Sequence, residues 1–162
     1  MSKKEKRSKV EKLLTKKQSC LSNHEQTVRM HQFLDCFVLC EIACKAVLEM
    51  YKKNNKTFTS KNNLRLDMKE IPAALKYAGY NIDSDILNSI FSGSGKYRKR
   101  GTMSARLLRN AVIHNLSEPD IKEICNRYEH LYNTMNIFLS HFGASGQQEQ
   151  NTQKPTPLNK AA

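Results

Sequence analysis

Apolar residues recur at helical spacing over several stretches of the chain, separated by polar and glycine-rich segments. In the longest stretch, Ser22 and Glu25 have the spacing of a capping box. Apolar side chains then recur every three or four residues to about Lys53, at Phe33, Phe37, Cys40, Cys44, Val47 and Tyr51. We predict a long helix here. Its apolar surface covers most of the circumference, so we expect it to lie inside a bundle or at a subunit interface.

The same periodicity predicts four further helical regions: Leu64–Ala78, Ser84–Phe91, a helix from Thr102 or Ser104 to about Asn115, and Ser117–Phe142. Pro72 suits a first helical turn better than a helix interior, so the first of these regions is expected to be kinked or split. Asp83 and Ser117 are expected N-caps. Because strand-forming runs are scarce, we expect an all-α protein in which residues 22–142 form an antiparallel bundle of about four to five helices.

Both ends of the chain differ in composition from this domain. Residues 1–21 form a basic arm, with eight Lys and Arg and two Glu before Gln18 and a thin apolar stripe of Val10, Leu13 and Leu14. Such an arm is either an amphipathic helix that forms on a partner or a mobile, solvated segment, and we favour the mobile arm. Residues 143–162 are rich in Gln, Asn, Thr, Ser, Gly and Pro, and we expect a disordered tail.

The composition indicates the cellular compartment of the protein and the class of partner that it binds. Lys and Arg number 27 against 15 Asp and Glu, a net charge of +12. This excess attracts RNA, DNA or an anionic membrane surface, unless it only maintains solubility. The most apolar run is interrupted by Glu41 and Lys45, so no membrane span is expected. An odd count of five cysteines, with no apolar targeting stretch after Met1, indicates a cytoplasmic protein with free thiols.

Common enzyme motifs are missing from the sequence. The glycines at 93 and 95 lack the spacing of a phosphate-binding loop, and there is no nucleophile elbow. Cys36, Cys40 and Cys44 recur every four residues, which favours packing over a zinc site. We therefore expect neither a metal site nor a cofactor. Glu41 and Lys45 are expected to form an intrahelical ion pair, with a place in a cleft wall as the alternative.

The segment from Lys96 to Arg109 carries six basic residues and no acidic one. A phosphodiester is drawn to such a place before any other in the ordered chain, which makes RNA the expected partner. We expect five of these side chains to hold the RNA backbone: Lys96, Arg98, Lys99, Arg100 and Arg106.

The helix that follows this basic segment carries residues suited to RNA cleavage. Arg106, Asn110 and His114 are four apart and share one helical face. Arg109 lies about 140° away from His114 around an ideal helix, so the two meet only if the last turn tightens or a second copy faces the first. A histidine can take a proton from a ribose 2′-hydroxyl or give one to the leaving oxygen, and an arginine stabilises the charge that develops on the phosphate. Asn110 is expected to orient these groups. Such a site needs no metal and acts only on RNA.

The six residues Arg109-Asn110-Ala111-Val112-Ile113-His114 resemble the Arg-x4–6-His motif of the HEPN superfamily of helical domains. Their context is similar too, with a long apolar helix first, the motif helix late, and a final helix after a short turn. The resemblance implies a metal-independent endoribonuclease that leaves a 2′,3′-cyclic phosphate, with Arg109, His114 and Asn110 as catalytic residues. It also implies a homodimer whose two motif helices form one composite cleft, and a toxin or phage-defence role, with an antitoxin or other regulatory protein as a partner. Leu116 stands where relatives silenced by a nucleotidyltransferase-type antitoxin often carry Tyr, which speaks against that form of control.

Two other functions stay open at this point. If His114 is a core or capping residue and Arg109 a surface charge, the chain is a catalytically inactive nucleic-acid-binding or scaffold module with the same fold. Alternatively, the basic arm docks an acidic protein or a membrane, and the chain is a partner-binding protein.

Overall fold

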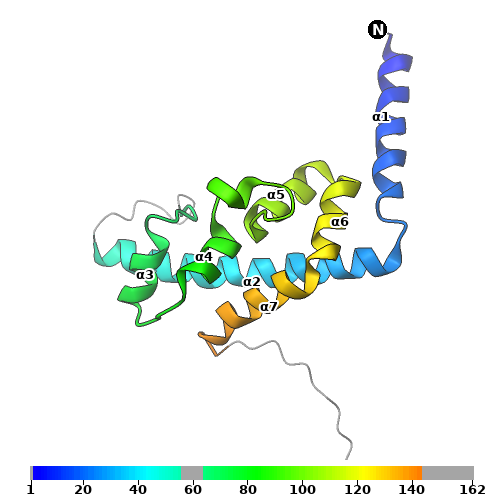
Figure 1. Cartoon of the computed structure of the whole chain (residues 1–162). Helices are drawn as coiled ribbons and strands as arrows, with labels where there is room; N and C mark the ends of the chain where they lie inside the picture. The colour runs from blue at the N-terminus through cyan, green and yellow to red at the C-terminus, as the bar shows by residue number, and fades with distance from the viewer. Residues whose placement is uncertain (1, 56–63, 144–162) are drawn as a thin grey trace, which may run out of the picture.

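The computed structural model describes residues 2–55 and 64–143, and every regular element in those ranges is helical (Figure 1). The expectation of an all-α protein is therefore confirmed. There are more helices than the four to five expected. The helices in chain order are α1 (Lys3–Ser19), α2 (His24–Asn54), α3 (Ile71–Tyr77), α4 (Ser84–Phe91), the 3-10 helix η2 (Gly95–Arg98), α5 (Ala105–Asn115), α6 (Glu118–Asn126) and α7 (Tyr128–Ser140). The expected tail lies outside the described residues, apart from Gly143.

The long helix α2 is the centre of the fold. It runs the length of the helical body, and α3, α5, α6 and α7 all pack against it (Figure 1). Its inner face is buried as the periodicity predicts, with the largest contributions from Phe33, Phe37 and Leu48. The helix starts one residue later than expected, because Asn23 Oδ1 accepts the Gln26 N–H at 3.1 Å and acts as the N-cap. Ser22 instead donates its hydroxyl to the Ser19 carbonyl.

Two predicted helical regions differ from the structure. The division of the last region into α6 and α7, together with α1 and η2, accounts for the higher count. In the region Leu64–Ala78 only α3 is regular, with Pro72 in its first turn, and Asp67 accepts the Lys69 N–H in a turn before it. The final helical region breaks at Arg127, whose backbone lies at φ −109° and ψ 11°. The guanidinium of Arg127 there donates to Glu123 in α6 and to the Met103 carbonyl before α5, so a long-range contact sits at the break.

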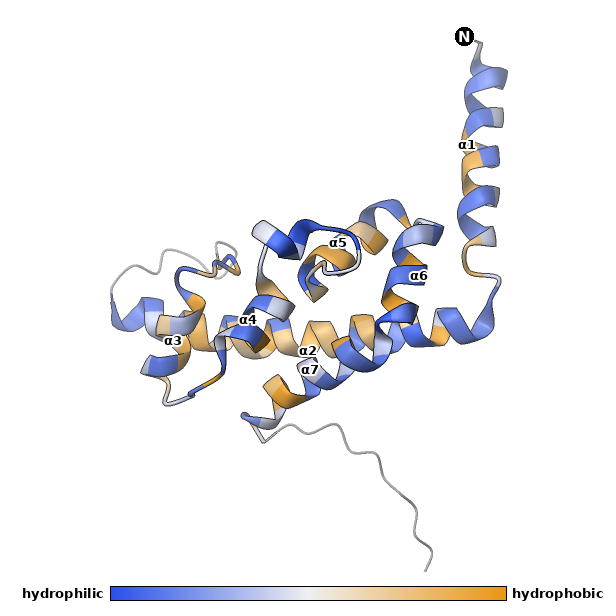
Figure 2. Cartoon of the chain, viewed as in Figure 1, coloured by the Kyte–Doolittle hydropathy of each residue, from blue (hydrophilic) through white to orange (hydrophobic). Residues whose placement is uncertain are grey.

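The basic arm forms a helix from Lys3 to Ser19, and the preference for a mobile arm stays a prediction. Ser2 and Glu5 form a reciprocal capping box at the start of α1, and the residues that follow are mostly good helix formers. No residue of α1 is buried, and the helix rises away from the body at one end of the molecule (Figure 1). Figure 2 shows that α1 is mainly hydrophilic, in contrast to α2. Within the described residues, no helix has the length and apolar character needed to cross a membrane.

Candidate functional site

Helix α5 presents the residues of the Arg-x4–6-His motif and is firmly anchored. The buried Ser104 caps its start, accepting the Leu107 N–H at 3.3 Å and donating its own hydroxyl to the Ser92 carbonyl at 2.6 Å. Leu108 and Val112 are buried and fix the inner face of the helix. Motif side chains on the remaining faces are therefore held on a rigid element rather than on a loop.

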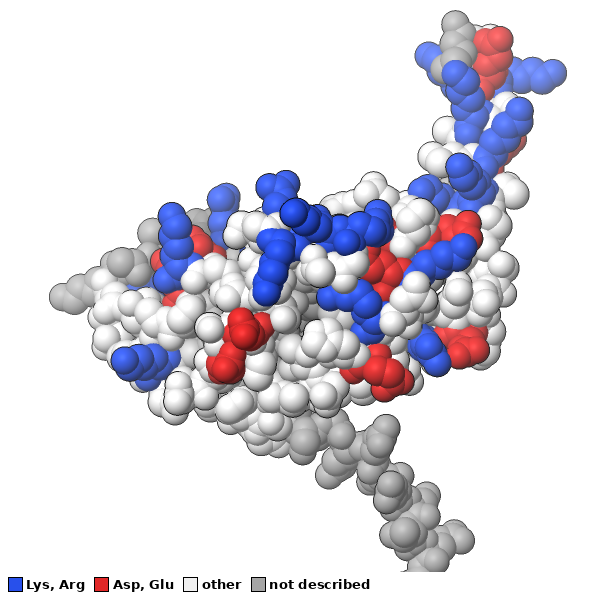
Figure 3. Space-filling view, in the orientation of Figure 1, with Lys and Arg blue, Asp and Glu red and all other residues white. Residues whose placement is uncertain are grey.

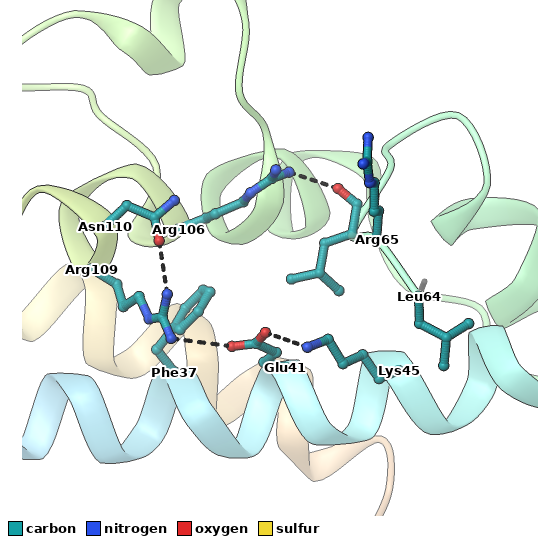
Figure 4. Close-up of a pocket in the computed structure, with 9 residues that line it drawn as sticks. Phe37, Glu41, Lys45, Leu64, Arg65, Arg106, Arg109 and Asn110 are labelled. Carbon is teal, nitrogen blue, oxygen red and sulfur yellow. Dashed lines mark hydrogen bonds and ion pairs between the residues drawn. The ribbon is translucent and has the colours of Figure 1, made fainter. Parts of the chain in front are cut away.

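Arg109 and Asn110 form a pair that reaches from α5 toward α2 (Figure 4). The Arg109 guanidinium donates to Asn110 Oδ1 at 2.9 Å and lies 3.9 Å from a carboxylate oxygen of Glu41. The other oxygen of Glu41 binds Lys45 Nζ at 2.7 Å. The Nε atom of Arg109 is buried and has no hydrogen-bond partner among the described residues. Two neighbours, Asn110 and Glu41, thus set the position of the guanidinium, and its Nε donor remains unsatisfied.

These side chains border an open pocket of about 230 Å³ between α2, α5 and the segment 64–66 (Figure 4). Its polar lining consists of four cations, one acid and one amide: Lys45, Arg65, Arg106, Arg109, Glu41 and Asn110. With this excess of positive charge the pocket favours an anion. The expected Glu41–Lys45 ion pair is confirmed, and the same two residues also form part of the pocket wall. Arg65 was not predicted, since it joins the site only through the fold.

His114 does not line this pocket. It lies in the last turn of α5, as expected, and its side chain is exposed. The helix ends immediately afterwards, because Leu116 adopts the left-handed conformation with φ 42°. Arg109 and Asn110 are thus brought together by one chain, whereas His114 stands at the exposed end of the same helix.

Two of the five side chains expected to bind RNA also form contacts that hold segments of the fold together. Arg106 donates to the carbonyls of Leu66 at 2.6 Å and Phe91 at 3.3 Å, and so ties α5 to the segments beside it. Arg100 donates to Asp120 at 2.7 Å and to Glu123 at 3.3 Å, two acids of α6 that are almost fully buried. Hydrogen bonding to Asp120 raises the pKa of Arg100 above its ordinary value. Both arginines have internal partners 15 to 40 residues away in sequence, which spacing alone does not reveal.

The other three basic side chains, Lys96, Arg98 and Lys99, are exposed. Lys96 Nζ lies 5.1 Å from the centre of the Tyr97 ring, and Arg98 and Lys99 have no ion-pair partner in the described part of the chain. Figure 3 shows Lys and Arg gathered along one edge of the body and along α1. These three residues are therefore available to a polyanion, and we refer to residues 96–100 as the basic loop.

Cys36, Cys40 and Cys44 lie in the core, on the inner face of α2. A hydrogen bond with Cys36 and burial raise the pKa of Cys40, and burial raises the pKa of Cys44 to about 12. Over the ranges 2–55 and 64–143, no three His, Cys, Asp or Glu side chains come together in a group that could hold a metal ion.

Comparisons of the chain with family models, with curated proteins and with solved structures gave no match.

Proposed function

We propose that this protein is a metal-independent endoribonuclease that acts as a symmetric homodimer. The observation that carries the proposal is the paired Arg109 and Asn110 at the rim of a cationic pocket, on the same rigid helix as an exposed histidine. These are the residue types that transesterification by a ribose 2′-hydroxyl requires. His114 would move the proton, Arg109 would stabilise the charge on the phosphate, and Asn110 would hold Arg109 in place.

Glu41 supports this assignment of Arg109. An arginine that contacts a phosphate must be oriented in advance, and the carboxylate of Glu41 and the amide of Asn110 hold the guanidinium from two sides. Both contacts leave the guanidinium at the pocket rim, with its side chain 30% exposed. An incoming phosphate can therefore reach it.

A second copy of the chain would complete the site, because Arg109 and His114 of one copy do not border the same pocket. Large apolar side chains are exposed on α2 and α5, which fits helices that another subunit covers in part. Val38, Leu39 and Ile42 of α2 are 43%, 54% and 59% exposed, and Ile113 of α5 is 54% exposed. A two-fold dimer in which the two α5 helices face each other would bring the His114 side chains of both copies near the symmetry axis. A toxin or phage-defence role, with its activity restrained by a regulatory partner, is part of the same proposal.

Cleavage assays on the purified chain test this function. We expect RNA to be cut in the presence of EDTA, leaving a 2′,3′-cyclic phosphate, and a substrate with a 2′-deoxyribose at the cut site to resist. His114→Ala should lower the rate by about 10²–10⁴-fold, and Arg109→Lys by about 10²-fold or more. His130→Ala, another exposed histidine, is the matched control and should cleave like the parent chain. Equal rates for the His114→Ala and His130→Ala variants would rule out the proposal.

The second candidate is a catalytically inactive nucleic-acid-binding module. It is favoured by the contacts of Arg109, whose guanidinium is engaged by Glu41 and Asn110 and borders a pocket that His114 does not line. In that case no metal-independent cleavage occurs, and neutralising Lys99 and Arg98 lowers RNA affinity while His114→Ala leaves it unchanged. Expression provides a first test, since only the nuclease should be toxic, and His114→Ala should relieve that toxicity.

A further inference from the structure

We propose that α1 is an RNA-binding arm that extends the site beyond the motif and selects RNAs long enough to reach both. The inference rests on the proposed function, in that RNA is taken as the substrate. It adds a second contact region that the motif does not supply, and a length requirement on the substrate.

The distribution of charge on α1 fits a polyphosphate. Eight Lys and Arg and two Glu lie in this helix. At 100° per residue, the basic side chains leave no arc wider than about 80° of the circumference without a positive charge. The apolar stripe of Val10, Leu13 and Leu14 is exposed and is flanked along the helix by Lys6 and Lys17. A helix that is cationic on all sides lacks the separate apolar and charged faces that an interfacial membrane helix needs.

The base of α1 is attached next to His114. Lys17 Nζ donates to the backbone carbonyl of Asn115 and, at 3.4 Å, to that of Leu116, the two residues at the C-terminal end of α5. A cation at this position is favoured by the helix dipole. Cys20 packs against the core just beyond α1, and Thr27 donates to the Leu21 carbonyl. The base of the arm therefore contacts the end of the motif helix, and Figure 3 shows Lys and Arg both along α1 and along one edge of the body.

The length of α1 determines what it can contact. Its 17 residues extend over about 25 Å. With one phosphate per about 3.4 Å of a stacked strand, that length corresponds to about seven phosphates. An RNA bound at His114 and along α1 must therefore continue for several nucleotides past the cut site, and a very short RNA cannot engage both.

The test measures RNA binding in a His114→Ala background, where the substrate stays intact. The arm variant carries Lys9→Gln, Lys12→Gln and Lys16→Gln, which retain helix propensity. The matched control carries the same change at three exposed lysines of the body: Lys69, Lys76 and Lys122. A third variant replaces Val10, Leu13 and Leu14 by Ala, and circular dichroism confirms that each variant is folded. The probes are single-stranded RNAs of about 20 and about 6 nucleotides, chosen to be longer and shorter than the arm, and vesicles that contain phosphatidylserine.

We expect the arm variant to bind the longer RNA at least about tenfold more weakly. The slope of log affinity against log salt should fall by about 2 in magnitude, because each lost lysine–phosphate contact lowers it by about 0.7. Binding of the short RNA should change no more than in the body control, and the alanine variant should bind RNA like the parent. Equal losses in the arm and body variants would overturn the proposal. So would binding to the vesicles that the alanine variant loses, because α1 would then be a membrane helix. These outcomes concern binding alone, so they are distinguishable from a failure to detect cleavage.

Discussion

Replacing Glu123 by Ala should destabilise the protein and loosen the end of the basic loop, which then contacts α6 through the Arg100–Asp120 pair. The side chain of Glu123 is only 5% exposed. One of its oxygens accepts the Gly101 N–H at 2.9 Å and a guanidinium N–H of Arg127 at 3.0 Å, and the other accepts from Arg100 at 3.3 Å. The carboxylate thus joins the end of the basic loop to the break between α6 and α7.

The size of the effect follows from the groups left without a partner. Loss of one member of a buried ion pair costs about 3–5 kcal/mol of unfolding free energy. Because the Arg100 side chain is exposed and water can solvate it, we expect the lower end of this range for Glu123→Ala, about 3 kcal/mol. Glu123→Gln retains an acceptor for Gly101 but loses the charge, so about 1–2 kcal/mol is expected. Either loss is a large part of the stability of a small domain, about 5–15 kcal/mol.

Urea unfolding followed by far-UV circular dichroism measures these differences. Glu118→Ala is the matched control, because Glu118 forms an exposed ion pair with Lys122 on the same helix, and we expect no measurable shift of the unfolding midpoint. RNA affinity, measured where all variants are folded, should fall for Glu123→Ala because the loop loses one of its two anchors on α6. An unfolding midpoint for Glu123→Ala equal to that of Glu118→Ala would contradict this prediction, because the contacts of Glu123 would then contribute no more to stability than an exposed ion pair.

Three further predictions concern the anchors of α5 and the core thiols. Ser104→Ala removes both the N-cap and the bond to Ser92, and should cost about 2 kcal/mol in urea unfolding, against no change for the exposed Ser94→Ala. Arg106→Met should lower the unfolding midpoint, because the guanidinium of Arg106 is bound to backbone carbonyls. For the same reason it should leave the slope of log RNA affinity against log salt unaltered, and a reduced slope would show that Arg106 contacts RNA. The pKa of Cys44 is raised to about 12 in the folded protein, so folding retains a proton that the unfolded chain loses above pH 9. Stability should therefore decline between pH 9 and 12, by up to about 1.4 kcal/mol per pH unit for this thiol, and the decline should be shallower in Cys44→Ala; equal slopes would contradict the assignment.

The sequence predicts most of the helical fold because local rules determine it. The apolar spacing of α2 identifies its buried face, and Asp83 and Ser117 cap their helices as expected. The prediction of a single helix in the last region is wrong, because no Pro or Gly marks the break at Arg127. That break coincides with hydrogen bonds to Glu123 and the Met103 carbonyl, and a contact across 24 residues leaves no local pattern.

In the candidate site too, local contacts could be predicted from the sequence and long-range contacts could not. Asn110 follows Arg109 directly, so their pairing lies within reach of local reasoning, and the position of His114 in the last turn of α5 is confirmed. The internal partners of Arg100 and Arg106 depend on the packing of distant segments. Net charge therefore identifies a basic region correctly but cannot separate the side chains that face solvent from those that hold the fold together.

In the proposed function, Arg109 and His114 promote cleavage of RNA by attack of the ribose 2′-hydroxyl on the neighbouring phosphate. The most direct test is to incubate the purified chain with RNA in EDTA and identify the new 3′ ends. We expect 2′,3′-cyclic phosphate ends from the parent chain, none from His114→Ala, and none at a position carrying 2′-deoxyribose. Intact RNA in every sample, or cleavage that persists in His114→Ala, would contradict the proposal.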